Sequence, residues 1–504
     1  MEGLAHLATA LAALAGPWQI AYALGATLAG IVIGLLPGLS ATLGVALFTT
    51  LTVKMAPTDA ILVLVCVYVG AIYGGSRTAI LLNIPGTAAN AAACLDGNAL
   101  ARQGEAGRAM GIATTGSVAG SLFGVVCLAM FTPLLAEAAL KFGAFEFFWL
   151  GMAGVMMSGT LTGERPVKGW LMGLLGILTA TVGLDPIHAH PRFTFGENAL
   201  TGGIGLIPAL VGAFGFAEVL TVMGQPRLRA AVSSVGSVLP KIADVLRHWR
   251  TIVRSGLIGV SIGVLPGVGE DMAAWSSYAA AKRASREKEK FGRGSVDGLI
   301  AAETGDNAAI PGALIPALAL GIPGSAPAAV LMAAMIIHGA QPGPMLMVNT
   351  PQYVYDIVGI TFFATLAILV FGLVLVRPIL WVLRVPREVI MPIVFVLCVL
   401  GSYSITQRLF DVWVMLGTGV LCFLLRRQGF PVAPFVLGLV LGDIIDKSLR
   451  RGLVLSDGSL APFFTRPISA ALAALVLVML LAQVPAVQRW WARRHGGKMQ
   501  APTP

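Results

Sequence analysis

The stretches GLLPGLSATL (residues 34–43) and LLNIPGTAAN (residues 81–90) each place a Pro-Gly pair inside an otherwise apolar run. The second half of the chain repeats this arrangement as GVLPGVGEDM (residues 263–272) and LGIPGSAPAA (residues 320–329). Proline removes a backbone donor and glycine favours non-helical conformations, so each break is expected to end a helix. Within a bilayer, the freed backbone groups are tolerated only where protein or a wet cavity shelters them. Matched broken helices in two halves of a chain are typical of the binding sites of transporters.

The composition of the chain indicates a polytopic membrane protein. Of 504 residues, 57% are hydrophobic and only 12% are charged, whereas soluble proteins carry about 25% charged residues. The net charge of +10 comes largely from two short stretches, residues 227–254 and 282–293, which hold six Lys or Arg residues each. Such basic stretches are expected in cytoplasmic loops of membrane proteins. We therefore expect contact with a lipid bilayer and none with nucleic acid.

The sequence gives no support for an enzyme or for a cysteine-based metal centre. The five cysteines are scattered through apolar segments without C-x-x-C spacing, which indicates neither disulfides nor a metal site. His188 and His190 are too few to form a metal centre, and we expect them on the surface of an outer loop. The chain contains no nucleophile elbow, Walker loop or H-E-x-x-H helix. We therefore expect neither catalysis nor an organic cofactor.

The charge pattern predicts an all-α polytopic membrane protein with two inverted-topology repeats, re-entrant hairpins or broken helices at the four breaks, and about eleven full crossings. Residues 255–281 lie between two basic stretches and carry the third break at their centre. Two arms of roughly 11–14 residues would reach about 16–21 Å, short of the ~30 Å hydrocarbon core, so a re-entrant hairpin is predicted. Residues 95–109 are basic and are expected to form a cytoplasmic loop, whereas the equivalent residues 338–350 contain no Lys or Arg and are expected to face the outside. This change of side is what inverted repeats produce.

The predicted organisation is an N-terminal helix (residues 1–17), a first transmembrane repeat (18–235), a second repeat (236–450) and a C-terminal transmembrane helix with a cytoplasmic tail (451–504). The first residues lack the basic region of a cleaved signal peptide, so the N-terminal helix is expected to be retained. We expect a multi-pass protein of the inner membrane, with residues 185–203 outside. A crossing by residues 430–450 stays open, because it would place Arg450 and its charged neighbours outside.

A helix that begins after a Pro-Gly break presents free N–H groups and a positive dipole end, which bind anions. We expect the four tips to converge on a small acid. The predicted substrate-binding residues are Gly38, Ser40, Arg77, Gly86, Thr87, Gly267, Gly324 and Ser325. Thr42 and Asn90 could equally serve only to satisfy freed backbone groups. Two roles stay open for Arg77, namely a bidentate grip on a substrate carboxylate and a positive anchor at the inner membrane surface.

Unwound carbonyls and the C-terminal ends of half-helices suit Na⁺ or H⁺. The predicted cation-binding residues are Pro37, Asn83, Pro85, Leu265, Glu270, Asp271, Asp306, Asn307 and Ile322. Glu303 precedes the last broken segment, and a carboxylate inside the membrane costs about 2.5–3.5 kcal/mol or more, which favours a cation or proton role. The alternative is that residues 301–308 lie hydrated at the interface. We expect Na⁺ rather than H⁺ as the coupling ion, with its ligand set open.

Four long stretches of the chain resemble the large membrane subunit of the bacterial tripartite tricarboxylate transporters. They are GLLPGLSATLGV (34–45), YGGSRTAILLNIPG (73–86), GLDPIHAHPRFTFG (183–196) and GALIPALALGIPGSAPAAVLMAAMIIHGAQPGP (312–344). The resemblance implies a cation-driven importer of organic acids such as citrate, which works with a four-helix small membrane subunit and a periplasmic substrate-binding protein. The signature residues of that family map onto Pro37, Gly38, Pro85, Gly86, Pro266, Gly267, Pro323 and Gly324.

The chain departs from the expected family pattern at Arg77, where we expect a small or aliphatic residue, and at the more basic residues 187–190. Either departure would fit an unusual substrate or a particular partner. Two other functions stay open, namely the large subunit of a related binding-protein-dependent dicarboxylate carrier and a non-transporting membrane scaffold. For the importer, we expect a hairpin-bearing domain to move during transport, in the manner of an elevator.

Overall fold

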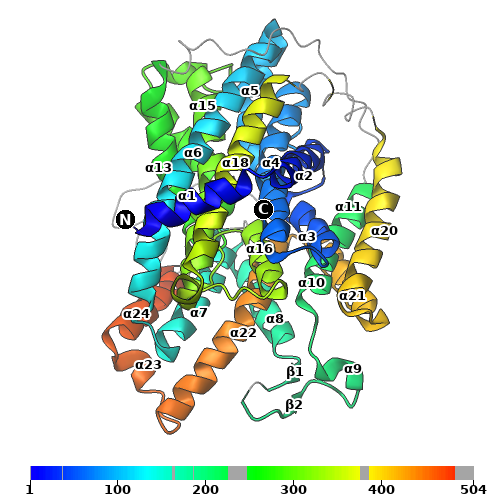
Figure 1. The fold of residues 1–504 in the computed structure, drawn as a ribbon, viewed down its shortest axis with the longest axis vertical. Coiled ribbons are helices and arrows are strands. Elements are labelled where there is room, and N and C mark those ends of the chain that lie inside the picture. Colours follow the sequence, from blue (N-terminus) through cyan, green and yellow to red (C-terminus); the bar gives the residue numbers. More distant parts are fainter. Residues whose placement is uncertain are drawn as a thin grey trace. The chain divides into compact units, whose positions relative to one another are not determined.

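The computed structural model describes residues 2–36, 38–161, 165–185, 187–224, 247–374, 378 and 385–482 (Figure 1). Helices make up nearly all of the regular structure, and the strands among these residues form a single two-stranded pair. Seven of the described helices are long and apolar enough to cross a membrane, and several shorter apolar helices accompany them. The prediction of an all-α polytopic membrane protein is therefore confirmed. The inversion of the repeats and the total of about eleven crossings stay predictions.

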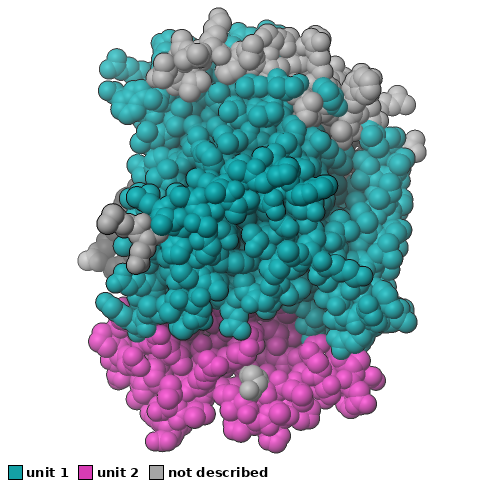
Figure 2. Space-filling view, in the orientation of Figure 1, with its two compact units in different colours: residues 1–141, 204–428 teal, residues 142–203, 429–504 magenta. Residues whose placement is uncertain are grey.

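The chain forms two compact units, which Figure 2 shows in different colours. Unit 1 comprises Met1–Lys141 and Ile204–Gln428, and unit 2 comprises Phe142–Gly203 and Gly429–Pro504. Each unit therefore takes segments from both predicted repeats, because helices that are distant in the chain pack together. The predicted boundaries follow a duplication of sequence, which stays a prediction.

The elements of each unit follow in chain order. Unit 1 contains α1 (Glu2–Leu14), α2 (Pro17–Leu35), α3 (Ala41–Thr52), α4 (Pro57–Leu82), η1 (Ala88–Asn90), α5 (Ala91–Leu100), η2 (Ala101–Glu105), α6 (Ala106–Ala139), α10 (Leu206–Leu210), η3 (Val211–Phe216), α11 (Ala217–Met223), α13 (Trp249–Gly263), α14 (Gly269–Ala284), η4 (Lys288–Lys290), α15 (Val296–Leu320), α16 (Ala326–Ile337), α17 (Pro344–Asn349), α18 (Pro351–Val374), α20 (Arg387–Thr406) and α21 (Leu409–Arg427). Unit 2 contains α7 (Ala144–Leu161), α8 (Pro166–Ala180), β1 (Gly183–Leu184), β2 (Pro191–Arg192), α9 (Asn198–Thr201), α22 (Val432–Leu455), α23 (Pro462–Thr465) and α24 (Pro467–Ala482).

Two helix crossings in unit 1 repeat the same close packing. In the first half, a methyl group added at Gly34 of α2 would overlap the carbonyl oxygen of Ala71 on α4. In the second half, a methyl group at Gly263 of α13 would overlap the carbonyl oxygen of Ala309 on α15. One turn earlier on the same helices, Gly30 and Gly259 make equivalent contacts with Val67 and Gly305. Glycines four residues apart let membrane helices approach closely, so the two halves use the same packing motif.

The chain leaves the helix at each of the four breaks, but the helices on either side differ in length. Helices α13 and α14, around the third break, have 15 and 16 residues. They reach about 22–24 Å each, which is short of the ~30 Å hydrocarbon core and fits the predicted re-entrant hairpin. Helices α4 and α15, before the second and fourth breaks, have 26 and 25 residues. These two are long enough to span the core, at about 37–39 Å.

Both long helices end in a left-handed residue, after which the chain turns back along the helix. Asn83 ends α4 with a φ of 56°, and Gly321 ends α15 with a φ of 71°. The N–H of Gly86 then donates to the carbonyl of Gly75 at 3.3 Å, and the N–H of Gly324 donates to the carbonyl of Ala313 at 3.3 Å. Each acceptor lies about 10 Å before the end of its helix. The second and fourth tips are therefore folded back into the helical layer.

Residues 95–109, expected to form a cytoplasmic loop, are helical instead. Helix α5 continues through the π-helical turn η2 into α6, and the direction changes at Gly104, whose φ of 85° only glycine adopts readily. On α5, Asp96 accepts hydrogen bonds of 2.8–2.9 Å from the backbone N–H groups of Gly292, Gly294 and Ser295. The two basic segments predicted to be cytoplasmic therefore lie together, although one of them is a kinked helix.

Unit 2 is built around a close, parallel pair of helices, α8 and α22. A methyl group at Gly176 would overlap the carbonyl of Phe435, and one at Gly442 would overlap the side chain of Ala180. The contacts advance in the same direction along both helices, so their C-terminal ends lie at the same side of the unit. After α8, the chain forms the antiparallel pair β1–β2 with Gly183 opposite Arg192. The charged end of α22 therefore lies on the same side as the loop predicted to be outside.

The close crossing of α2 and α4 yields a stability test. We expect Gly34→Ala to destabilise the protein by about 1–3 kcal/mol, because the added methyl group forces the two backbones apart. Gly25→Ala is the matched control on the same helix, because nothing lies within 4 Å of the added carbon. The melting temperature of the detergent-purified protein would measure both changes. Equal melting temperatures for the two variants would contradict this account of the crossing.

Candidate functional site

The third and fourth breaks meet at a tyrosine from the first half of the chain. The hydroxyl of Tyr68 on α4 donates a hydrogen bond to the carboxylate of Glu270, in the first turn of α14. The same hydroxyl lies 2.7 Å from Oγ of Ser325, the N-cap residue of α16. All three side chains are buried. This group, Tyr68, Glu270 and Ser325, is called the tyrosine cluster below.

A second buried cluster joins the second break to α15. Glu303 accepts hydrogen bonds from Ser76 of α4 at 2.7 Å and from Ser117 of α6 at 2.8 Å, both on Oε2. The Nδ2 atom of Asn90 donates to Oγ of Ser76 at 3.0 Å and to Oδ2 of Asp306 at 3.2 Å. Each of these five side chains is at least 99% buried. Helices α4, α6 and α15 and the turn η1 therefore share one polar network.

Two further residues complete this second group. Oγ1 of Thr87 lies 2.6 Å from Oδ1 of Asn90, and Nδ2 of Asn307 donates to Oδ1 of Asp306 at 2.7 Å. Together Ser76, Thr87, Asn90, Ser117, Glu303, Asp306 and Asn307 form the carboxylate cluster. Helix α14, which carries Glu270, packs against η1, which carries Asn90. The two clusters therefore adjoin each other, and the second, third and fourth breaks contribute to them.

Two oxygens in the carboxylate cluster are buried without a partner among the described residues. They are Oε1 of Glu303 and Oδ1 of Asn307, and both residues are fully buried. A buried acceptor that lacks a donor costs about 1–3 kcal/mol, and more when it is charged. Within the described part of the chain, His, Cys, Asp and Glu do not gather in groups of three or more that could hold a metal ion. A cation would therefore be held by carboxylate, amide and backbone oxygens together.

Arg77 lies inside the protein, with only 1% of its surface exposed. Its guanidinium donates to the carbonyl of Met110 at 2.8 Å and to Oγ1 of Thr114 at 2.9 Å. It also stacks 4.3 Å from the ring centre of Tyr73 and interacts electrostatically with Glu303. The two terminal nitrogens of Arg77 are thus used within the helix packing, whereas its buried Nε has no partner among the described residues. It is placed to balance the charge of Glu303 and to hold α4 against α6.

The structure brings together Thr87, Asn90, Glu270, Glu303, Asp306, Asn307 and Ser325 among the residues singled out from sequence. Asn83 is exposed at the end of α4 and takes no part in these side-chain hydrogen bonds. The other predicted residues that take no part in them are Gly38, Ser40, Thr42, Pro85, Gly86, Leu265, Gly267, Asp271, Ile322 and Gly324. Ser40 instead caps α3, accepting from the N–H of Leu43 at 3.1 Å. Pro37 lies outside the described residues.

Sequence reasoning missed Tyr68, Ser76 and Ser117. All three lie away from the Pro-Gly breaks, and Tyr68 and Ser117 lie in long apolar segments. A usable signal was the density of polar side chains on α4, a helix that is otherwise apolar. Tyr68 and Ser76 lie about two helical turns apart on that helix, so they can face the same interior.

Sequence comparison identifies the family to which this site belongs. The tripartite tricarboxylate transporter TctA family matches residues 20–437. The chain belongs to this family. An uncharacterized 52.8 kDa protein in the TAR-I ttuC′ 3′ region of Agrobacterium vitis is 35% identical to this chain over 492 residues. The match covers 97% of this chain and 98% of the relative.

A shorter relative, an uncharacterized protein in the TAR-II ttuC′ 3′ region of Agrobacterium vitis, is 35% identical over 233 residues. That match covers 46% of the TctA-family chain and 96% of the relative. No solved structure gives a significant match. The family is one of transporters that work in a tripartite system with membrane and periplasmic partners. Membership therefore supports the resemblance and a transport role.

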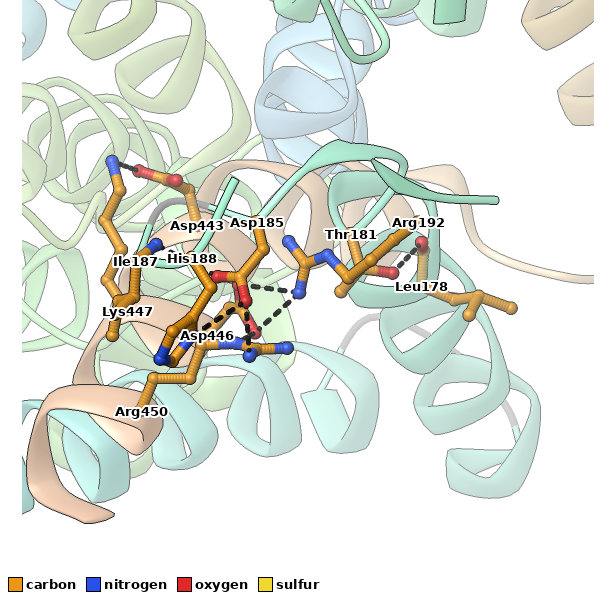
Figure 3. A network of polar contacts seen from close by, with 10 residues as sticks. All are labelled: Leu178, Thr181, Asp185, Ile187, His188, Arg192, Asp443, Asp446, Lys447 and Arg450. Carbon is orange, nitrogen blue, oxygen red and sulfur yellow. Dashed lines mark hydrogen bonds and ion pairs between the residues drawn. The ribbon is translucent and has the colours of Figure 1, made fainter. Parts of the chain in front are cut away.

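In unit 2 of the TctA-family chain, a network of ion pairs ties the loop between β1 and β2 to α22 (Figure 3). Arg192 binds both oxygens of Asp446 at 3.0–3.1 Å. Arg450 donates to Asp446 at 3.0 Å and to Asp185 at 2.8 Å. His188 is exposed, as predicted, and lies 3.6 Å from Asp185. Pairing with two acids lowers the free-energy cost of placing Arg450 outside the membrane.

The carboxylate of Asp185 is stabilised in its charged form. The N–H of Ile187 and the guanidinium groups of Arg450 and Arg192 together hold the pKa of Asp185 below its ordinary value. A group with a depressed pKa stabilises the fold above its unfolded pKa, about 3.9 for aspartate. This contribution is lost as the pH falls through the lower pKa of the folded state.

The Asp185 network yields a pH-dependent stability test. We expect Asp185→Asn to lower the melting temperature of the purified protein at pH 7, because Arg450 loses a charged partner. The difference in melting temperature between this variant and the wild type should narrow as the pH falls below about 4, because the carboxylate of Asp185 in the wild type then becomes protonated. Asp443→Asn is the matched control, because Asp443 is exposed and pairs with Lys447 on the same helix. A gap that persists or widens in acid would contradict the role of the charge.

Proposed function

We propose that this chain is the transport subunit of a binding-protein-dependent secondary importer in the bacterial inner membrane. It carries organic acid anions, tricarboxylates or dicarboxylates, inward together with a cation, Na⁺ rather than H⁺. The observation that carries the proposal is the pair of linked buried clusters at the broken helices. Family membership supports transport, and the chemistry of these clusters supports coupling to a cation.

The buried site has an excess of acidic groups. Glu270, Glu303 and Asp306 are buried there, and the one buried basic side chain beside them among the described residues is Arg77. Unpaired buried charges are costly, so the site is stable only with a cation bound or with carboxyl groups protonated. The excess of carboxylates thus supports the proposal that the site needs a bound cation to be stable.

The same excess explains how cation and substrate would be coupled. Two like unit charges 6 Å apart repel by about 3 kcal/mol at an effective dielectric constant of ~20. An organic acid anion is therefore repelled from the empty site until a cation reduces its negative charge. Because coupling between two binding events is reciprocal, the anion in turn tightens cation binding. Uptake would then follow the cation gradient.

The free oxygens in the carboxylate cluster favour Na⁺ over H⁺. A proton could neutralise Glu303, but it would leave the amide oxygen of Asn307 without a partner, because an amide is not protonated near neutral pH. Carboxylate and carbonyl oxygens both suit a hard metal cation, and the two residues lie about one turn apart on α15. The second proposed group of cation ligands, around Glu270 and Asp271, lies on the first turn of α14.

The partners follow from the family. We propose that a periplasmic binding protein delivers the solute on the side of residues 185–203, and that a four-helix small membrane subunit completes the complex. Movement of a domain that carries the hairpin α13–α14, in the manner of an elevator, would expose the site to the inside. The hairpin suits this role because its arms are too short to be fixed across the whole core.

Uptake by vesicles that contain all three subunits would test the proposal. We expect an inward sodium gradient to drive accumulation of the acid, and Glu303→Gln to reduce sodium-driven uptake at least tenfold, because the cation loses its charged ligand. Glu287→Gln is the matched control, since Glu287 is exposed and pairs with Lys290 on the surface. Uptake by the wild type that ignores both sodium and pH gradients would overturn the coupling.

A further inference from the structure

A separate cavity of about 350 Å³ lies between the end of α16 and the start of α18. It belongs to neither buried cluster. Its size falls near the lower end of the range of small-molecule pockets, about 300–1,000 Å³. The side chains that line it include His338, Gln341, Leu346, Asn349, Thr350 and Tyr353. We call it the outer pocket, because residues 338–350 are expected to face the outside.

Two residues that line the outer pocket each carry a polar atom that is buried without a partner among the described residues. These atoms are Nε2 of His338 and the hydroxyl oxygen of Tyr353. Leaving such groups unpaired costs about 1–3 kcal/mol each. The two residues come from different elements, one after the end of α16 and one on α18. The residues that line the pocket thus carry two unused hydrogen-bonding groups.

The lining mixes polar and apolar side chains and is uncharged. Gln341 and Asn349 add amide groups, and no Lys, Arg, Asp or Glu lines the cavity. The nearby acid Asp356, about one turn along α18 from Tyr353, accepts a hydrogen bond from Gln352 at 2.8 Å. Several neutral N–H and O–H donors around a small cavity suit a carboxylate. They would bind it more weakly than a guanidinium would, so that it could be passed on.

The outer pocket is linked to the proposed transport site through α16. Ser325, at the start of this 12-residue helix, contacts Tyr68, and His338 follows its end about 18 Å away. The loop that lines the pocket is held against α15, because the N–H of Gly343 donates to the carbonyl of Leu318 at 3.1 Å. A ligand in the pocket would therefore lie against the segment that connects α16 to α18.

From this arrangement we infer that the outer pocket is a second, weaker binding site for the transported organic acid. Tyr353 and the Nε2–H tautomer of His338 donate hydrogen bonds to one of its carboxylates. The acid occupies this site before it reaches the buried clusters. The inference rests on the proposed function, since it assumes that the same class of acid crosses the protein.

Titration calorimetry on the detergent-purified chain, with citrate, malate and tartrate as probes and Na⁺ present, tests the inference. We expect one of these acids to bind at two sites, and Tyr353→Phe to weaken the weaker site about tenfold, because one hydrogen bond to a charged group is lost. Glu303→Gln should leave that site intact. Tyr403→Phe is the matched control, since Tyr403 is an exposed tyrosine on α20.

Binding at a single site, binding of none of the three acids, or two sites that Tyr353→Phe leaves unchanged would each overturn the inference. Loss of the weaker site on addition of phosphatidylglycerol would also overturn it, because the pocket would then hold a lipid headgroup. Failure of the proposed function is distinguishable, since it would show as wild-type vesicles that do not accumulate the acid. If wild-type uptake is normal and Tyr353→Phe does not alter its KM, the outer pocket alone is excluded.

Discussion

A carboxylate buried among membrane helices must receive hydrogen bonds or a cation, and the structure around Glu303 is arranged by this requirement. Two serines from different helices donate to one of its oxygens, and Arg77 supplies an opposite charge nearby. Its second oxygen has no donor among the described residues. The packing of α4, α6 and α15 therefore provides hydrogen bonds to Oε2 of Glu303 and leaves Oε1 free to bind a ligand.

The backbone makes this arrangement possible. Glycines at the crossings of α2 with α4 and of α13 with α15 let the helices approach until backbones touch, which brings short polar side chains within hydrogen-bond reach. The left-handed ends at Asn83 and Gly321 then turn the chain back, so that the second and fourth tips lie inside the helical layer. A tip that ended at the membrane surface would meet water instead, and its polar groups would not need one another.

Charge is handled differently in unit 2. There the arginines Arg192 and Arg450 are paired with Asp446 and Asp185, and the loop after α8 is fixed to α22 (Figure 3). The positive-inside rule counts the basic residues of α22 as though each were free. In the folded protein Arg450 is held by two acids. A crossing by α22 thus conflicts less with the charge rule than the sequence alone indicates.

The sequence by itself determined the class of the protein, the positions of the four breaks, the acids Glu270, Glu303 and Asp306 of the site and the neighbouring amide of Asn307. It could do so because apolar length, Pro-Gly pairs and a carboxylate in an apolar run are local properties. Only the tertiary structure decided that Tyr68 joins Glu270 to Ser325, that Arg77 is buried against α6, and that residues 95–109 form a kinked helix rather than a loop. These outcomes depend on partners far away in the chain, and no local pattern encodes which distant helix supplies a donor.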